Sequence, residues 1–86
     1  MYDYLIKKYV EHLTKDDINK YATKEGINLT EKETDVIYEY IKNDWRTFYY
    51  GNPREKLNEM KELLEEETYK KIEKLYIEAK NKLNNM

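Results

Sequence analysis

Few side chains in this sequence have the types and spacing that catalysis or metal binding needs. His12 is the only histidine, no Ser or Cys nucleophile pattern lies near it, and no second His provides metal-ligand spacing. The absence of cysteine excludes thiol catalysis, thiolate metal sites and disulfides. We therefore expect no enzyme, no cofactor and no metal, and we interpret His12 as a surface or boundary residue.

Two acidic runs have oxygen ligands that a cation could use. They lie at residues 16–17 and 65–67, and neither has the spacing and the glycine of a calcium-binding loop. Solvated helix faces explain both runs. The glycosylation sequon at residues 28–30 has meaning only in a secreted protein, and its Thr30 is better employed as a helix cap.

The aromatic stretch from Trp45 to Tyr50 has the composition of a binding surface. Trp, Tyr and Arg are the residue types of binding hot spots, because they bury a large area and keep a polar tip. On a helix, Trp45 and Phe48 can face the core, but Arg46, Tyr49 and Tyr50 cannot all join them. The side chains of this stretch that cannot face the core are covered either by the C-terminal helices of the same chain or by another chain.

These residues predict a non-enzymatic protein-interaction module. Its partner is another protein or a second copy of the chain, which would form a homodimer. The predicted partner-binding residues combine the aromatic stretch with the apolar stripe that follows it: Trp45, Arg46, Phe48, Tyr49, Tyr50, Leu57, Met60 and Leu64.

The elements that position these residues are read from apolar periodicity. Apolar residues of a first helix fall within about 140° of one another on a helical wheel; they are Tyr2, Leu5, Ile6, Tyr9, Val10 and Leu13. Thr14 can cap a second helix, from about Lys15 to Lys24, that ends before a left-handed Gly26. This second helix is expected to bury Ile18, Tyr21 and Ala22.

A short extended link, residues 26–30, is expected to lead into a third helix. Thr30 and Glu33 have the spacing of a reciprocal capping box. The buried stripe of the third helix is expected to be Val36, Ile37, Tyr40 and Ile41, with Trp45 and Phe48 continuing it if the helix persists past residues 43–44.

The C-terminal part, residues 54–84, begins after the breaker at residues 51–53 and has no Gly or Pro. Its first apolar stripe, formed by Leu57, Met60, Leu63 and Leu64, is rotated by about 100° from the later one, formed by Tyr69, Ile72, Leu75, Tyr76, Ala79 and Leu83. We therefore predict a break near residues 65–68. One long helix whose two ends pack on different neighbours is the alternative.

The amino-acid composition limits the possible fold class and cellular location. The chain has 86 residues, 40% charged and 40% hydrophobic, with a net charge of −2, which is typical of a salt-bridged helical domain. We expect one all-α domain over residues 1–86, a compact bundle of four to five short helices with a helix-extended-helix unit in its N-terminal half. No apolar run approaches the ~18 residues of a membrane span, so we expect a cytoplasmic protein with no membrane contact.

The helix-extended-helix unit, residues 16–42, is also similar in outline to nucleic-acid-binding modules of the SAP type, which is the alternative function. Binding a polyanion requires clustered Lys and Arg. The second helix of the unit instead begins with Glu31, Glu33 and Asp35, and the whole chain is slightly acidic. A nucleic-acid partner is therefore the less favoured reading.

Apolar spacings and caps over residues 14–83 resemble the YqfT-like family, small uncharacterised proteins of low-GC Gram-positive bacteria. The resemblance is carried by Ile18, Tyr21, Ala22, Ile27, Leu29, Thr30, Val36, Ile37, Tyr40, Ile41, Asn52, Pro53 and Leu57. It implies a helical fold. The family has no assigned activity, so the resemblance brings no catalytic residue.

Overall fold

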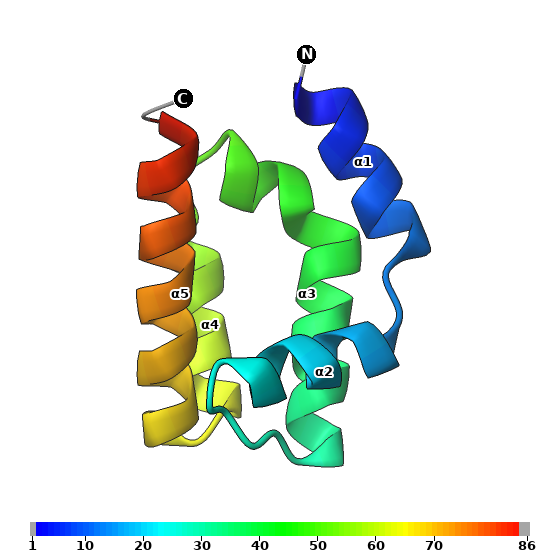
Figure 1. The fold of residues 1–86 in the computed structure, drawn as a ribbon. Coiled ribbons are helices and arrows are strands. Elements are labelled where there is room, and N and C mark those ends of the chain that lie inside the picture. The colour runs from blue at the N-terminus through cyan, green and yellow to red at the C-terminus, as the bar shows by residue number, and fades with distance from the viewer. Residues whose placement is uncertain (1, 85–86) are drawn as a thin grey trace.

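The computed structural model describes residues 2–84 and folds them into five helices without a strand (Figure 1). The helices are α1 (Tyr2–His12), α2 (Lys15–Lys24), α3 (Glu31–Tyr49), α4 (Arg54–Leu63) and α5 (Glu66–Asn84). The predicted all-α bundle of four to five helices is confirmed. The predicted contributions of Tyr2 and Leu83 to apolar stripes lie outside the side chains that the structure describes.

Two reciprocal capping boxes fix the starts of α2 and α3. The amide of Glu33 donates to the Thr30 hydroxyl at 3.1 Å, and the amide of Thr30 donates to the Glu33 carboxylate at 3.0 Å. Thr14 caps α2 as expected, and Asp17 completes a second box that the sequence analysis did not identify. Gly26 ends α2 with φ of 77°, the left-handed conformation that favours glycine.

The break predicted in the C-terminal part exists, between the end of α4 at Leu63 and the start of α5 at Glu66. Leu64 adopts an extended conformation, with φ −114° and ψ 157°. The amide of Glu65 donates to the Glu33 carboxylate at 3.1 Å, so the side chain that caps α3 also anchors the entry to α5. One continuous helix over residues 54–84 is therefore wrong.

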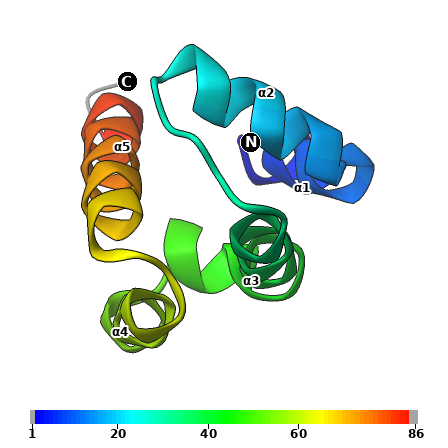
Figure 2. The same ribbon diagram turned by 90° about the horizontal axis from the view of Figure 1, so that it is seen from below.

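The helices follow one another around a horseshoe rather than a closed ring (Figures 1 and 2). α1 and α2 pack on α3, and α4 packs between α3 and α5. Figure 2 shows the open side between α5 and the pair formed by α1 and α2. α5 thus forms one wall of the molecule, and α1 with α2 forms the other.

The core lies around α3, and its buried side chains come from all five helices and from the links between them. Its buried apolar residues are Val10, Leu13, Ile18, Ala22, Ile27, Ile37, Met60, Leu64 and Tyr69. The least exposed of these, Ile27, still exposes 3% of its surface, which reflects a core that is open on one side.

Five apolar residues predicted to face inward are exposed, and those predictions are wrong; they are Leu5, Tyr9, Tyr21, Leu63 and Ala79. Leu5, Tyr9 and Tyr21 expose 61%, 65% and 54% of their surface. The cause is the open side of the horseshoe, because α5 does not close onto the apolar edges of α1 and α2. Leu63 is exposed because it lies at the edge of its stripe and is the last residue of α4.

Candidate functional site: an apolar cleft between two helical walls

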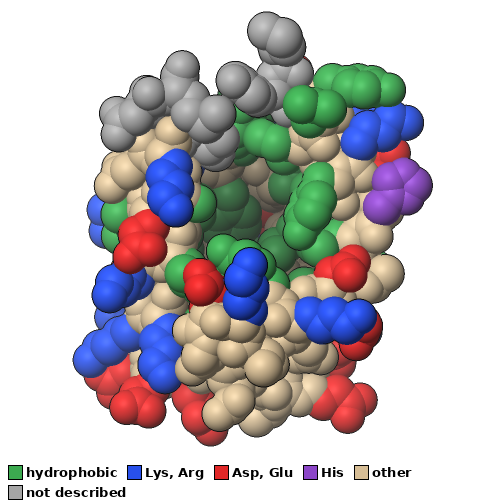
Figure 3. Space-filling view, in the orientation of Figure 1, with side chains coloured by type: hydrophobic (Ala, Val, Ile, Leu, Met, Phe, Trp, Pro, Cys, Tyr) green, Lys and Arg blue, Asp and Glu red, His purple; other side chains and the backbone are tan. Residues whose placement is uncertain are grey.

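An apolar cleft of about 440 Å³ occupies the open side of the horseshoe. Figure 3 shows it as a hollow between α5 and α1, above α2, with hydrophobic side chains on its walls. All five helices and the link between α2 and α3 contribute to its lining. Ligand-binding pockets commonly have volumes of about 300–1,000 Å³ and lie between the helices of bundles.

One wall of the cleft is a helical stripe on α5. Ile72, Leu75, Tyr76 and Ala79 line it at positions i, i+3, i+4 and i+7. This spacing places the four side chains along one face of the helix. Ile72, Leu75 and Tyr76 are half-buried and Ala79 is exposed, so the stripe runs from the interior to the mouth of the cleft.

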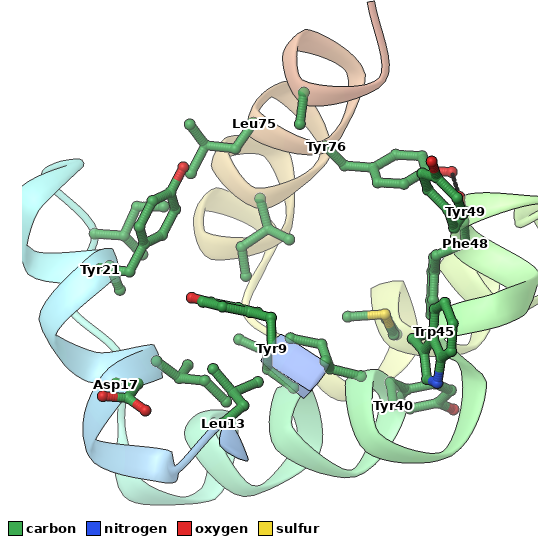
Figure 4. Close-up of a pocket in the computed structure, with 18 of the residues that line it drawn as sticks. Tyr9, Leu13, Asp17, Tyr21, Tyr40, Trp45, Phe48, Tyr49, Leu75 and Tyr76 are labelled. Carbon is green, nitrogen blue, oxygen red and sulfur yellow. Dashed lines mark hydrogen bonds between the residues drawn. The ribbon is translucent and has the colours of Figure 1, made fainter. Parts of the chain in front are cut away.

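The opposite wall comes from α1 and α2. On α1, Ile6 and Tyr9 line the cleft one helical turn apart, and Leu13, directly after the end of α1, lines it as a buried side chain. On α2, Tyr21 lines the cleft with its side chain directed toward Leu75 across the opening (Figure 4). Tyr9 lies near the middle of the same view, between the two walls.

A kink at Asp44 brings the aromatic end of α3 to the cleft. Asp44 leaves the helical conformation, with φ −124° and ψ 16°, and its carboxylate lies 3.6 Å from the Lys56 ammonium. Beyond the kink, the Phe48 and Tyr76 rings meet edge to face with their centroids 5.8 Å apart. α3 and α5 are thereby joined at one end of the cleft.

Donors on α5 satisfy the last carbonyl groups of α3. The Tyr76 hydroxyl donates to the Phe48 carbonyl at 2.6 Å, and the Lys80 ammonium donates to the Tyr49 carbonyl at 2.7 Å. Helix C-termini leave such carbonyls without partners in the helix itself. The phenol is protonated at neutral pH and can donate, and burial raises the pKa of Tyr76 above its ordinary value.

The predicted partner-binding residues divide between three places. Trp45, Phe48, Tyr49, Leu57 and Met60 line the cleft, which brings most of the predicted set together. Leu64 is buried in the core behind it.

Arg46 and Tyr50 lie on an outer corner instead. There a depression of about 250 Å³ forms between the end of α3 and the start of α1, and Trp45 borders it too. The Arg46 guanidinium lies 4.6 Å from the centroid of the Trp45 ring, and the Tyr49 and Tyr50 rings are 4.6 Å apart. The expectation that the aromatic stretch cannot be buried on one face is confirmed by the exposure of Arg46 and Tyr50.

Sequence reasoning missed the residues at the mouth of the cleft. Tyr9, Tyr21 and Ala79 were expected in apolar stripes, and nothing in a stripe shows whether a neighbouring helix covers it. A signal was nevertheless present, because an 86-residue chain with ten tyrosines and one phenylalanine has many apolar side chains that tolerate contact with water.

Among the described residues that line the cleft, only Asp17 and Lys80 carry charge. The Asp17 carboxylate is part of the capping box of α2. Hydrogen bonds from the Thr14 amide and hydroxyl hold the pKa of Asp17 below its usual value. Asp17 and Tyr49, the residue that Lys80 contacts, lie on opposite sides of the cleft in Figure 4. Along most of its length the cleft offers apolar contact rather than polar chemistry.

The lining also limits which ligands the cleft can hold. Over residues 2–84, no group of three or more His, Asp or Glu side chains is placed to bind a metal ion. An engineered apolar cavity of about 150 Å³ takes one benzene molecule, so about 440 Å³ takes roughly three groups of that size. The geometry suits several large apolar side chains presented together.

The helix-extended-helix unit is present, and ion pairs within the molecule hold some of its lysines. Lys15 lies 2.9 Å from the Asp35 carboxylate, and Lys20 lies 3.2 Å from Asp16. Lys42 donates to the carbonyls of Val10 and Glu11. No described helix is both long and apolar enough to cross a membrane.

Comparison with known proteins identifies the family of this chain. The model of a family described as a protein of unknown function, DUF2624, matches residues 1–79, and the chain belongs to this family. No curated protein and no solved structure matches the chain.

Proposed function

We propose that this member of the DUF2624 family is a non-enzymatic, cytoplasmic protein-interaction module. Its cleft receives the apolar face of an amphipathic helix from another protein chain. The observation that carries the proposal is the open apolar cleft between two helical walls.

Helical packing supports this class of partner. Side chains at i, i+3, i+4 and i+7 form ridges and grooves that accept the ridges of another helix. The α5 wall has this spacing in Ile72, Leu75, Tyr76 and Ala79. Amphipathic helices that bind in grooves use apolar anchors at similar intervals, and three such anchors match the volume of the cleft.

The energy available from closing the cleft is large for a domain of this size. The exposed parts of Tyr9 and Tyr21 amount to about 120 Å² each, taking ~200 Å² for a tyrosine side chain. Burying them contributes about 3 kcal/mol each before the costs of association are subtracted. Since such a domain has a net stability of roughly 5 kcal/mol, occupancy would also stabilise the fold.

A binding experiment with a designed helix tests the proposal. The probe is a short helical peptide of Ala, Glu and Lys with three leucines on one face, and its control has the same composition with the leucines scattered around the helix. Trp45 lines the cleft, so its fluorescence reports occupancy. We expect saturable binding of the first peptide and much weaker binding of the second.

Two matched variants locate the binding site. Ala79→Arg places a long side chain in the mouth of the cleft from an exposed position, whereas Asn81→Arg adds the same charge to α5 at an exposed position outside the lining. We expect Ala79→Arg to abolish peptide binding and Asn81→Arg to preserve it. Equal binding by both variants, or equal binding of both peptides, would overturn the proposal.

A further inference from the structure

The charged side chains closest to the apolar stripe of α5 are lysines. On a helical wheel, Lys71 and Lys82 lie along one edge of the stripe and Lys80 along the other, each about 70–90° from its centre. The acidic residues of α5 lie farther round, at about 110–130°; they are Glu66, Glu67, Glu73 and Glu78. Both edges of this wall of the cleft therefore begin with positive charge.

Lys71 and Lys82 bracket the stripe along the axis of α5. Lys82 follows Lys71 by eleven residues, which is about three turns and about 16 Å, and the stripe lies between them. Both side chains are exposed, and the Lys71 ammonium reaches the Gly26 carbonyl on the link between α2 and α3, at 3.4 Å. Figure 3 shows Lys and Arg side chains along the α5 wall of the hollow.

These three lysines have no carboxylate partner within the described residues 2–84. Lys80 is half-buried and donates to the Tyr49 carbonyl. On the opposite wall, the Asp17 carboxylate already accepts the Thr14 amide in the cap of α2. A helix that covers the stripe removes water from the ammonium groups beside it, and this costs free energy unless the helix brings negative charge.

We propose that the helix that occupies the cleft is acidic along the edges of its apolar face. Its apolar anchors pack on the α5 stripe, and its carboxylates meet Lys71 and Lys82 on one edge and Lys80 on the other. A basic helix with the same apolar face would bring like charges together, so the lysines select between partners of equal hydrophobicity. This inference rests on the proposed function, because it gives the charge of the partner that the same cleft binds.

Two designed helices with the same leucine face test the charge of the partner. In the acidic peptide, glutamates flank the three leucines on both sides; in the basic peptide, lysines take the same positions. The fluorescence of Trp45, which lines the cleft, reports occupancy. At low ionic strength we expect the acidic peptide to bind about ten-fold more tightly than the basic one, and we expect high salt to reduce this preference.

Two double variants of equal net charge locate the effect. Lys71→Glu with Lys82→Glu reverses the charge along one edge of the stripe. Lys32→Glu with Lys61→Glu makes the same change of net charge at exposed positions on α3 and α4. We expect the first variant to prefer the basic peptide and the second to keep the preference for the acidic one. Circular dichroism should show both variants folded.

The outcomes separate this inference from the proposed function. Equal binding of the two peptides by the parent chain would overturn the acidic partner and would leave the cleft as a helix-binding site. The same holds if reversal of Lys71 and Lys82 leaves the preference for the acidic peptide unchanged. Failure of both peptides to bind would contradict both proposals.

Other occupants of the cleft give different results in the same assay. Dodecanoate has one carboxylate and one apolar chain, and if it bound the cleft more tightly than the acidic peptide, a small anionic amphiphile would be the occupant and both proposals would be wrong. A dimer of the free chain that the acidic peptide cannot dissociate, measured by sedimentation equilibrium, would assign the cleft to a second copy and overturn the acidic partner.

Discussion

Replacing Glu33 with Gln is the most informative single change to the fold. Glu33 is 4% exposed, and its carboxylate accepts two amide hydrogen bonds, one from Thr30 at the start of α3 and one from Glu65 before α5. It therefore holds together segments that are 32 residues apart in the sequence. A glutamine has the same shape but only one accepting oxygen.

The magnitude follows from what the glutamine can still satisfy. One amide keeps a hydrogen bond that falls from charge-assisted to neutral, a loss of about 1 kcal/mol. The other amide loses its acceptor in a partly buried place, which costs about 2 kcal/mol. The sum of about 3 kcal/mol is more than half of the roughly 5 kcal/mol expected for the whole domain.

Thermal and urea unfolding, followed by circular dichroism, measure this change. Because 1 kcal/mol shifts Tm by about 4–8 °C in a domain of this size, we expect Glu33→Gln to lower Tm by about 15 °C. Asp17→Asn is the matched control, since Asp17 has the same position in its capping box but is exposed and accepts no second helix amide.

Hydrogen exchange separates the two bonds of Glu33. The Glu65 amide should lose protection in Glu33→Gln beyond the loss that global destabilisation causes. The reasoning is refuted if Glu33→Gln destabilises no more than Asp17→Asn, or if the Glu65 amide exchanges as it does in the parent chain.

Three further predictions concern the fold and its titrating groups. Gly26→Ala should lower the free energy of unfolding by about 1 kcal/mol, measured in urea, because alanine is strained at φ of 77° although its methyl group has space. A hydrogen bond to Glu59, with burial and nearby negative charge, raises the pKa of Tyr40 to about 12. An ultraviolet titration should show Tyr40 ionising last among the tyrosines. Glu59→Gln should move the pKa of Tyr40 back toward 10.0. Burial works to raise the pKa of Glu33, but the amide hydrogen bonds outweigh burial and hold the pKa below 4.5. Since the folded state favours the carboxylate, the stability that these bonds contribute is present above pH 4.5 and is lost as the pH falls below it. The urea midpoint of Glu33→Gln should therefore depend less on pH in that range than the midpoint of the parent chain.

Local features of the fold could be predicted from the sequence because their causes are local. The Thr30 box depends on two side chains three residues apart, and the left-handed end at Gly26 depends on a residue without Cβ. The break between α4 and α5 was visible as a rotation between two apolar stripes. The second amide bound by Glu33 was not visible, because the sequence does not show that Glu65 lies beside it.

The cleft could be predicted only in part, for a physical reason. Apolar periodicity identified the edges of α1 and α2, yet Tyr9 and Tyr21 face an opening because α5 stays apart. Whether a stripe is covered depends on how the last helix is anchored, and here the kink at Asp44 and the two hydrogen bonds to the end of α3 fix α5. The aromatic residues were found in sequence, and their division between cleft and outer corner required the fold.

The central claim is that the apolar side chains of another chain close the cleft. Isotope-filtered nuclear Overhauser spectra of the labelled protein with the unlabelled three-leucine peptide test it most directly. The account predicts intermolecular cross-peaks from the leucine methyl groups of the peptide to the Tyr9 ring and to the Ala79 methyl group, which line opposite walls of the cleft. Intermolecular cross-peaks confined to the outer corner at Arg46 and Tyr50, with none from the cleft, would contradict it.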